Sequence, residues 1–250
     1  MMKRLYSTVL VLFSCVLFNI EASELYSTVR FGFTANDFPP YVMPSQKKNK
    51  GIMFDILKVV MNDLGYKVEI KTLPRKRIHQ FLDKGRLDII ATAKEWMEDS
   101  NDYHFTNTIV SVNDVLWYLS ENLLLYNEPK DLLGKNIATH RGYNYPTLEP
   151  YFEEKAIGRM EVDSDLKVLK MILNKRVDSG IVADRTGEWL AKKYQFKNKI
   201  KYSRKHISSY NYRFAFHKNS KISALFDEVD KKINDLKSSQ RYENILNKYL

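Results

Sequence analysis

The stretch that decides the fold is residues 51–93, GIMFDILKVVMNDLGYKVEIKTLPRKRIHQFLDKGRLDIIATA. In parts of this stretch apolar residues recur every three or four positions, and in other parts at every second position. Gly65 and Gly85 stand where the helices are expected to end. The pattern predicts, in order, a helix over 51–64, a strand over 67–73, a helix over 74–83 and a strand over 87–93. With the alternating segment 28–35 before it, this order is typical of a parallel sheet with crossover helices.

A second set of strands and helices occupies the middle of the chain, after a long strand predicted over 110–120. We expect strands over 136–139, 160–162 and 177–183, and helices over 146–156, 165–174 and 186–194. A strand over 210–217 and two amphipathic helices complete the chain, and they have no sheet of their own. The simplest arrangement packs this last segment against the first set of strands and helices.

The predicted fold class is therefore α/β, with two lobes joined by two crossing strands and a cleft for a small ligand between them. We place the first lobe at residues 23–118 plus 213–250 and the second at 119–212.

The N-terminal residues indicate a secreted protein. A basic start, the almost wholly apolar run 5–18 and the small residue Ala22 follow in the order of a secretory signal peptide, which we place at residues 1–22. The mature chain would then lie in the periplasm. An uncleaved N-terminal anchor and a lipoprotein cleavage box around Cys15, the single cysteine, stay open as alternatives.

The composition gives no sign of special chemistry. The chain has 250 residues, 44% of them hydrophobic and 13% aromatic, which is enough for a sizeable core. The net charge of +10 comes from scattered basic residues, without an arginine-rich tract, so nucleic-acid binding is not expected. No nucleophile elbow, phosphate loop or dinucleotide glycine pattern is present. The five histidines lack the spacing of metal ligands, and we predict neither a metal nor a cofactor.

Short motifs run in order through nearly all of the mature chain. They are Val29–Phe33, Asp37–Tyr41, Gly51 with Phe54-Asp55-Ile56, Gly85–Ile90, Leu133–Ala138, Arg141–Tyr143, Lys175–Asp178 and the ending Tyr242–Leu250. Together they resemble the family-3 extracellular solute-binding proteins, the periplasmic type of amino-acid transport systems. The resemblance implies two lobes that close over a ligand, and delivery of that ligand to a membrane transporter.

The departures from the family pattern concern the ligand. Amino-acid binders of the family usually carry Thr-X-X-Arg after the Asp-X-Ile-Ile strand, and that arginine grips the ligand carboxylate. Here residues 92–99 read TAKEWMED, with no arginine; Lys94 would offer only a point charge. In the family, a Gly-Thr or Gly-Ser at a helix start offers backbone N–H groups to the same carboxylate. Here that helix start is expected at Gly142-Tyr143-Asn144, just after Arg141. The acid that usually meets the ligand amine has Asp184 as its candidate. These departures argue against an ordinary α-amino acid.

Several residues are candidates for ligand contact, each with a structural alternative. Phe38 and Tyr41, on a stiff proline loop, either face the cleft or pack against the lobe. Arg77, in a segment that resembles a Pro-Trp-X-Arg motif of the family, reaches an acidic ligand group or lies on a solvated basic face. Asp184 binds an amine, or pairs with Arg185 or caps the next helix. The full set is Phe38, Tyr41, Arg77, Thr92, Trp96, Arg141, Gly142, Tyr143, Asn144 and Asp184.

The sequence predicts a monomer that captures a small polar, amino-acid-like or acidic metabolite by hinge closure, without catalysis, and passes it to a membrane permease. Two alternatives stay open. An enzyme similar to periplasmic cyclohexadienyl dehydratases would need a general acid in the cleft, and only Glu95 and Asp184 are visible candidates. A sensory partner would instead present its ligand-bound shape to a membrane receptor.

Overall fold

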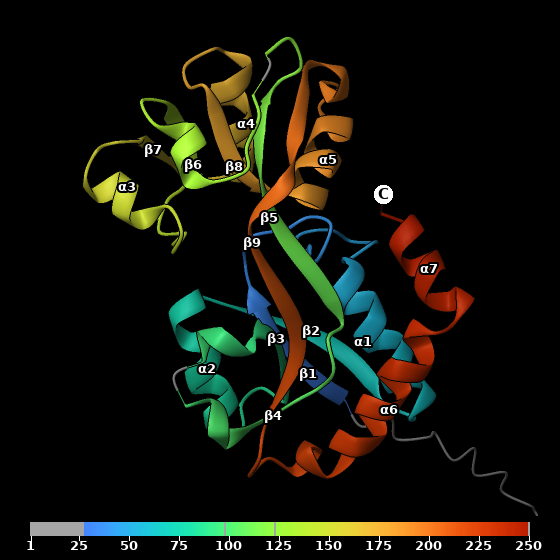
Figure 1. The fold of residues 1–250 in the computed structure, drawn as a ribbon. Helices are drawn as coiled ribbons and strands as arrows, with labels where there is room; N and C mark the ends of the chain where they lie inside the picture. Colours follow the sequence, from blue (N-terminus) through green and yellow to red (C-terminus); the bar gives the residue numbers. More distant parts are fainter. Residues whose placement is uncertain (1–27, 98, 123, 250) are drawn as a thin grey trace, which may run out of the picture.

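The computed structural model describes residues 28–97, 99–122 and 124–249, which form two α/β lobes joined by two long crossing strands (Figure 1). This confirms the predicted fold class. The predicted signal peptide, including Cys15 and Ala22, lies outside the described residues. Within the described ranges, none of the helices combines the length and apolar character that a membrane span requires.

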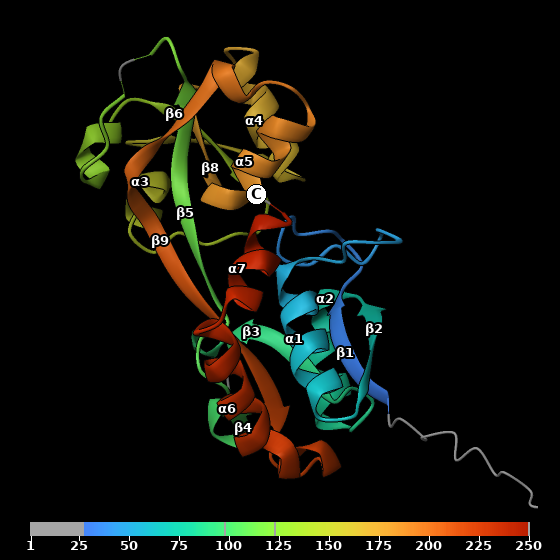
Figure 2. The same cartoon turned by 90° about the vertical axis from the view of Figure 1, so that its right-hand side faces the viewer.

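The first lobe is built around parallel strands with helices on both faces (Figures 1 and 2). Its N-terminal elements are β1 (Thr28–Thr34), α1 (Ile52–Asp63), β2 (Lys67–Leu73), α2 (Arg75–Asp83), β3 (Ile89–Ala93) and β4 (Tyr103–Phe105). Strand β1 pairs in parallel with both β2 and β3. The C-terminal helices α6 (Phe226–Lys237) and α7 (Gln240–Asn247) pack against α1 of this lobe.

Helix α1 shows why the sequence folds in this way. Its residues Ile52, Ile56 and Val60 recur at helical spacing, and all three are buried in the core of the lobe. Gly51, just before the helix, has φ 109°, and a Cβ at this position would approach the Tyr41 carbonyl oxygen to 2.5 Å. Only glycine fits such a conformation and such a close approach.

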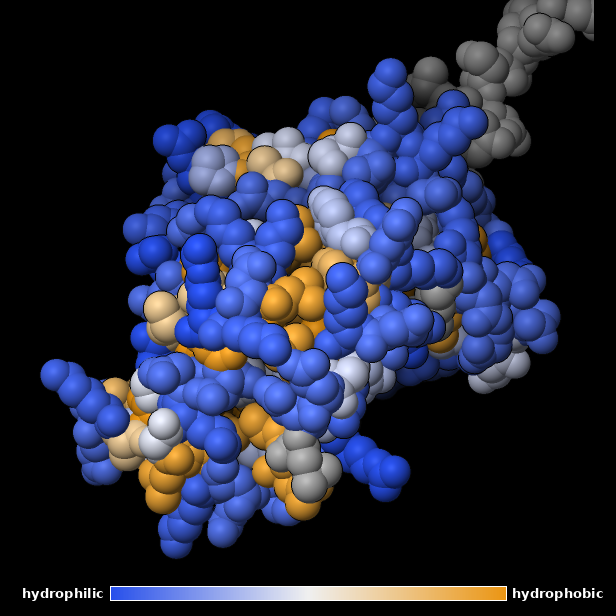
Figure 3. Space-filling view, turned by 90° about the horizontal axis from the view of Figure 1, so that it is seen from above, coloured by the Kyte–Doolittle hydropathy of each residue, from blue (hydrophilic) through white to orange (hydrophobic). Residues whose placement is uncertain are grey.

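The second lobe repeats the same principle. Its elements are β6 (Asn136–His140), α3 (Glu149–Glu153), β7 (Gly158–Val162), α4 (Asp165–Leu173), β8 (Ser179–Ala183) and α5 (Asp184–Lys193). Strand β6 lies between β7 and β8 and is parallel to both. Separate apolar clusters fill the two faces of this sheet, as expected for parallel strands covered on both sides. Seen from above, the surface is mostly hydrophilic, with apolar side chains in small patches (Figure 3).

Two predicted elements differ clearly from the structure, and one short strand was not predicted. The helix predicted over 146–156 is reduced to α3, because Arg159 of β7 donates to Glu149 and to the Tyr143 carbonyl and holds the preceding residues in turns. Strand β9 (Ile200–His217) begins ten residues before the predicted start at 210. Its first half is mostly polar, lacks a clear apolar alternation and is defined by pairing with β5. Strand β4, only three residues long, was not predicted.

The connection between the lobes is the antiparallel pair of β5 (Val110–Leu119) and β9, which places all strands of the described residues in one continuous sheet. The register is irregular between Asp114 and Val115, where the pair crosses from one lobe to the other. An irregularity of this kind bends a strand and re-aims a side chain.

A buried hydrogen bond also joins the lobes beside the cleft. The Thr186 hydroxyl, in the first turn of α5, donates to the Pro39 carbonyl of the first lobe at 2.6 Å. The Thr186 residue has no solvent exposure. An acceptor left without a donor in such a place costs free energy, so this bond stabilises the present arrangement of the lobes.

Replacing Thr186 tests this contact. Thr186→Val keeps the side-chain shape but leaves the Pro39 carbonyl unpaired, and we expect the free energy of unfolding to fall by about 1–3 kcal/mol. Thr186→Ser, which keeps the hydroxyl, should lose clearly less. Urea denaturation followed by circular dichroism measures both. Equal losses in the two variants would show that packing, not the hydrogen bond, explains the effect.

Candidate functional site

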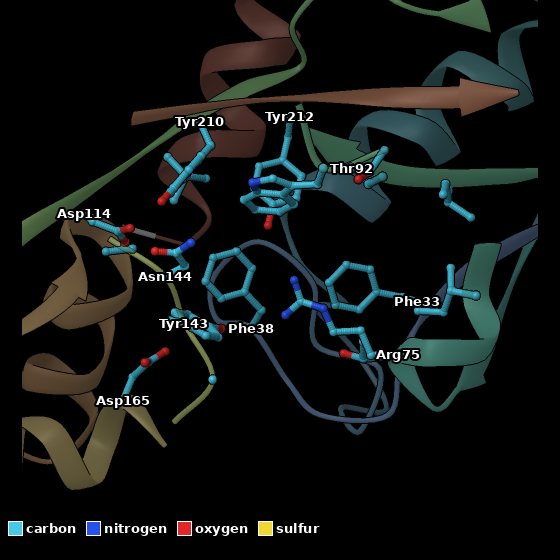
Figure 4. A pocket seen from close by; sticks show the side chains of 18 of the residues that line it. Phe33, Phe38, Arg75, Thr92, Asp114, Tyr143, Asn144, Asp165, Tyr210 and Tyr212 are labelled. Atoms are coloured by element: carbon cyan, nitrogen blue, oxygen red, sulfur yellow. The ribbon is translucent and has the colours of Figure 1, made fainter. Parts of the chain in front are cut away.

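A cavity of about 400 Å³ lies between the two lobes, within the range of small-molecule sites. Its walls come from β1 and the loop after it, α2 and the end of β3 in the first lobe, the crossing strands, and the loop after β6 and the start of α4 in the second lobe. Figure 4 shows side chains from all three parts pointing into the same space.

Aromatic rings form most of one wall. The Trp96 ring lies 5.0 Å from that of Tyr210 and 5.4 Å from that of Tyr212, and the Phe38 ring lies 6.2 Å from Tyr212. Tyr143 of the second lobe lies across from them (Figure 4). Rings at such distances form a rigid surface on which a flat, apolar or cationic group stacks.

Asp114 supplies a carboxylate where the crossing strands change lobes. It lines the cavity and is only 7% exposed, and its Oδ2 accepts a hydrogen bond from the Ser208 hydroxyl at 2.8 Å. Burial raises the pKa of Asp114 to about 6, although hydrogen bonds from Ser208 and Tyr210 oppose the rise. A buried carboxylate of this kind gains most from a positively charged partner, and a ligand could provide one.

Asp165 supplies a second carboxylate, at the start of α4. Ser164 caps this helix through its hydroxyl, as predicted, and so fixes the residue that follows. Asp165 Oδ1 lies 3.0 Å from His140 Nδ1, and the His140 ring stacks on Tyr143 with the centroids 4.4 Å apart. The ring at the cavity wall and the carboxylate are thus held by the same histidine.

Arg75 brings a positive charge to the other side of the cavity, in the first turn of α2 (Figure 4). Its guanidinium carbon lies 5.9 Å from the centre of the Trp96 ring, within the range of a cation–π interaction. A planar guanidinium beside a ligand space is suited to bind a carboxylate through two hydrogen bonds.

The structure brings six of the predicted candidates to this cavity. They are Phe38, Thr92, Trp96, Gly142, Tyr143 and Asn144. Of these, Trp96 is 38% exposed, so its ring borders the opening as well as the wall. That they contact a ligand stays a prediction.

The other four candidates lie outside the cavity lining. Tyr41 is fully buried, with its ring 4.8 Å from that of Phe38, which corresponds to the alternative of packing against the lobe. Arg77 lies on the exposed side of α2. The guanidinium of Arg141 is paired with Asp163 at the surface, and Asp184 accepts hydrogen bonds from the Asn113 amide and the Arg185 backbone N–H.

Two expectations about the site need correction. Residues 142–144 lie in a loop rather than at a helix N-terminus, because α3 begins only at Glu149. The carboxylates proposed for an enzyme, Glu95 and Asp184, do not line the cavity, whereas Asp114 and Asp165 do. In the described part of the chain, no cluster of three or more acidic, histidine or cysteine side chains is arranged to hold a metal.

The cavity residues that the sequence analysis missed differ in whether a sequence pattern marks them. Asp114 is a lone carboxylate inside an otherwise largely apolar strand, which is a recognisable sign of a functional residue. Tyr210 and Tyr212 alternate along a predicted strand and share one face. Arg75 and Asp165 each stand at the start of a helix, and no sequence pattern separates them from other charged residues there.

The family described as "Bacterial extracellular solute-binding proteins, family 3" matches residues 29–250. The chain belongs to this family. It is therefore a solute-binding protein of the extracellular type, which confirms the resemblance found in the sequence. No curated protein sequence matches it.

Solved structures with similar folds have low sequence identity to the chain. A substrate-binding protein of an amino acid ABC transporter has 22% identity and a TM-score of 0.63, over 90% of this chain and 99% of that one. A histidine kinase sensor domain similar to periplasmic binding proteins has 19% identity and a TM-score of 0.67, over 90% and 96%. The ancestral amino acid-binding protein AncCDT-1, a precursor of cyclohexadienyl dehydratase, has 18% identity and a TM-score of 0.66, over 89% and 95%. These likenesses support the fold.

The raised pKa of Asp114 predicts a dependence of stability on pH. The folded-state pKa of about 6 exceeds the ordinary value of 3.8, so ionising this carboxyl destabilises the fold. The cost is absent below about pH 4 and fully present above about pH 6, where it is on the order of 3 kcal/mol. Asp114→Asn should therefore raise the free energy of unfolding at neutral pH and leave it nearly unchanged near pH 4.

Urea denaturation at the two pH values measures this effect. Asp163→Asn is the matched control, because Asp163 is an exposed carboxylate of the second lobe and should change little at either pH. A gain for Asp114→Asn that is equal at both pH values would contradict the expected ionisation.

Proposed function

We propose that this protein captures a small, amino-acid-like solute between its lobes and holds it by hinge closure. The observation that carries the proposal is the distribution of charge in the cavity, with Arg75 on one side and Asp114 and Asp165 on the other (Figure 4). A ligand with one anionic and one cationic group would satisfy both sides. The aromatic wall between them suits the apolar part of such a molecule.

The balance of charges narrows the ligand further. Two carboxylates and one arginine line the cavity, and Asp165 already has His140 as its partner. A ligand without a cationic group would therefore leave the buried Asp114 carboxylate without an opposite charge. A zwitterion, or a zwitterion with an additional amino or guanidino group, is favoured over an acidic metabolite. Arg75 takes over the role that the absent Thr-X-X-Arg arginine has in the resembling binders, from a different element.

Closure follows from the placement of the ligand contacts. Arg75 and Trp96 belong to the first lobe, whereas Tyr143 and Asp165 belong to the second. Only the closed arrangement allows one molecule to touch all of them, so ligand binding shifts the equilibrium towards closure. We propose that the hinge lies within β5 and β9, where the register is irregular after Asp114. Residues 115–118 pack with the second lobe, so on β5 we place the division here rather than at the expected 118/119.

The proposed setting is the periplasm, after removal of residues 1–22. There the protein would act as a monomer that delivers its ligand to an ABC-type permease. A sensory role, with a membrane receptor in place of the permease, is the alternative that the likeness to a sensor domain keeps open.

Two arginines of α2 give a matched test of the site. Arg75→Ala should lower the affinity for the ligand at least tenfold, because a charge-assisted pair is removed from the cavity wall. Arg77→Ala, two residues along the same helix and outside the cavity lining, should bind normally. Thermal-shift screening of amino acids and amino-acid-like amines finds the ligand, and calorimetry then compares the variants.

The screen also has an outcome that would refute the proposal. If acidic compounds without an amine gave the largest shifts, or if Arg77→Ala lost as much affinity as Arg75→Ala, the assigned charge distribution would be wrong. A ligand whose binding survives both changes would place recognition elsewhere.

A second candidate function, an enzyme of the dehydratase type, is favoured by one observation. Asp114 lines the cavity and has a pKa of about 6, which suits a group that donates a proton near neutral pH. Incubation with prephenate and with arogenate, followed by detection of phenylpyruvate or phenylalanine, tests it. Under the binding proposal no product accumulates; product formation that is lost in Asp114→Asn would establish the enzyme instead.

A further inference from the structure

A second hollow, of about 840 Å³, lies where the lobes meet and shares no lining residue with the ligand cavity. One wall is the loop over residues 43–49 with the end of the chain at Lys248 and Tyr249, and the other is the C-terminal half of α5. Figure 2 shows α5, the loop before α1 and the end of α7 converging at this place. We call it the basic groove.

The charge of the basic groove is uniform. The lysines that line it are Lys47, Lys48, Lys192, Lys193 and Lys248, and the described lining includes no Asp or Glu. Asp55 neutralises Lys248 from outside the lining, with Nζ 2.7 Å from Oδ2. A concave surface whose charges have one sign focuses its field on an opposite charge.

The groove also contains apolar surface. Trp189 lies in the wall formed by α5, and Lys193 Nζ lies 4.5 Å from the centre of its ring. Met43 and Tyr249 contribute from the opposite wall. An occupant therefore meets several ammonium groups around an aromatic and aliphatic floor, rather than charge alone.

We propose that the basic groove binds an acidic segment of a partner protein, with glutamate or aspartate side chains against the lysines and an apolar side chain against Trp189. The shape of the groove favours a protein segment over an anionic membrane. A bilayer is flat and contacts residues that protrude, whereas a hollow of this volume with apolar surface admits an extended chain. Charge complementarity of this kind sets both the association rate and the choice of partner.

The position of the groove makes this partner sensitive to the state of the lobes. Lys47 and Lys48 belong to the first lobe and Lys192 and Lys193 to the second, so a change in the angle between the lobes moves the two pairs relative to each other. The loop that carries Lys47 begins at the same segment as Phe38, and α5 follows directly after Ala183, both of which line the ligand cavity. A segment that needs both walls therefore distinguishes one lobe arrangement from another.

Binding of a labelled acidic peptide to the full secreted chain tests the proposal. The probe is a fluorescein-labelled peptide of glutamates interrupted by phenylalanines, and its counterpart with glutamine in place of glutamate is the peptide control. We expect Lys47→Glu with Lys48→Glu, and separately Lys192→Glu with Lys193→Glu, to weaken binding roughly tenfold or more in fluorescence anisotropy. Lys218→Glu with Lys221→Glu, exposed lysines distant in sequence from the groove, should change it less than about twofold.

Each remaining outcome counts for or against the proposal. The proposal is wrong if the control pair weakens binding as much as the groove variants do, or if the acidic peptide does not bind at all. It is also wrong if the protein binds phosphatidylglycerol vesicles through the groove lysines but does not bind the peptide. One variant pair lies on a loop and the other on a helix, so the loss of folding in one leaves the other informative. The peptide assay is run without added small-molecule ligand and its variants lie outside the ligand cavity, so failure of this proposal leaves the proposed ligand site untouched, and failure of the Arg75 test leaves this one untouched.

Discussion

The antiparallel pairing of β5 with β9 is the constraint on which the rest of the molecule depends. These strands bring the two sheets into one, and they pass between lobes whose helices and parallel strands are otherwise separate. The pair is hydrogen-bonded from Val110 to Leu119 except at the register irregularities just after Asp114, so the lobes can change their angle only by bending it. The bend is easiest where the ladder is already interrupted. The residue that a ligand would neutralise is thus located at the site of bending.

The electrostatics of the cavity give this coincidence a physical consequence. A carboxylate at Asp114 is unfavourable in the empty site, because only Ser208 and Tyr210 compensate for its lost solvation. A cationic group of a ligand would remove that cost and simultaneously require the second lobe, through Asp165, to come close. The same interaction with Asp114 would then contribute both to the affinity for the ligand and to closure of the lobes. The Thr186–Pro39 hydrogen bond would hold the lobes together at another place in the same junction.

Much of the fold could be predicted from the sequence, and the limits have identifiable causes. The helix at 52–63 and its core face followed from apolar spacing, and the C-terminal return followed from the absence of a sheet there. Strand β9 was shortened in the prediction because residues 200–209 form a strand only through pairing with β5. The cavity residues were harder to predict than the fold. Phe38 and Trp96 could be found because aromatic residues in loops are conspicuous in a sequence. The sequence could not show that Arg75 rather than Arg77, and Asp165 rather than Asp184, would line the cavity, because that depends on which side of each helix start faces it.

The two hollows at the junction are connected by the elements they share. The loop over residues 38–49 borders the ligand cavity at one end and the basic groove at the other, and β8 with α5 does the same from the second lobe. Any ligand that fixes the angle between the lobes also fixes the distance between the two lysine-bearing walls. By thermodynamic linkage, a partner that prefers one such distance changes the affinity for the ligand by the same factor as the ligand changes the affinity for the partner. The shape of the junction would therefore couple the proposed recognition of a small molecule to the proposed recognition of a protein segment without a separate moving part.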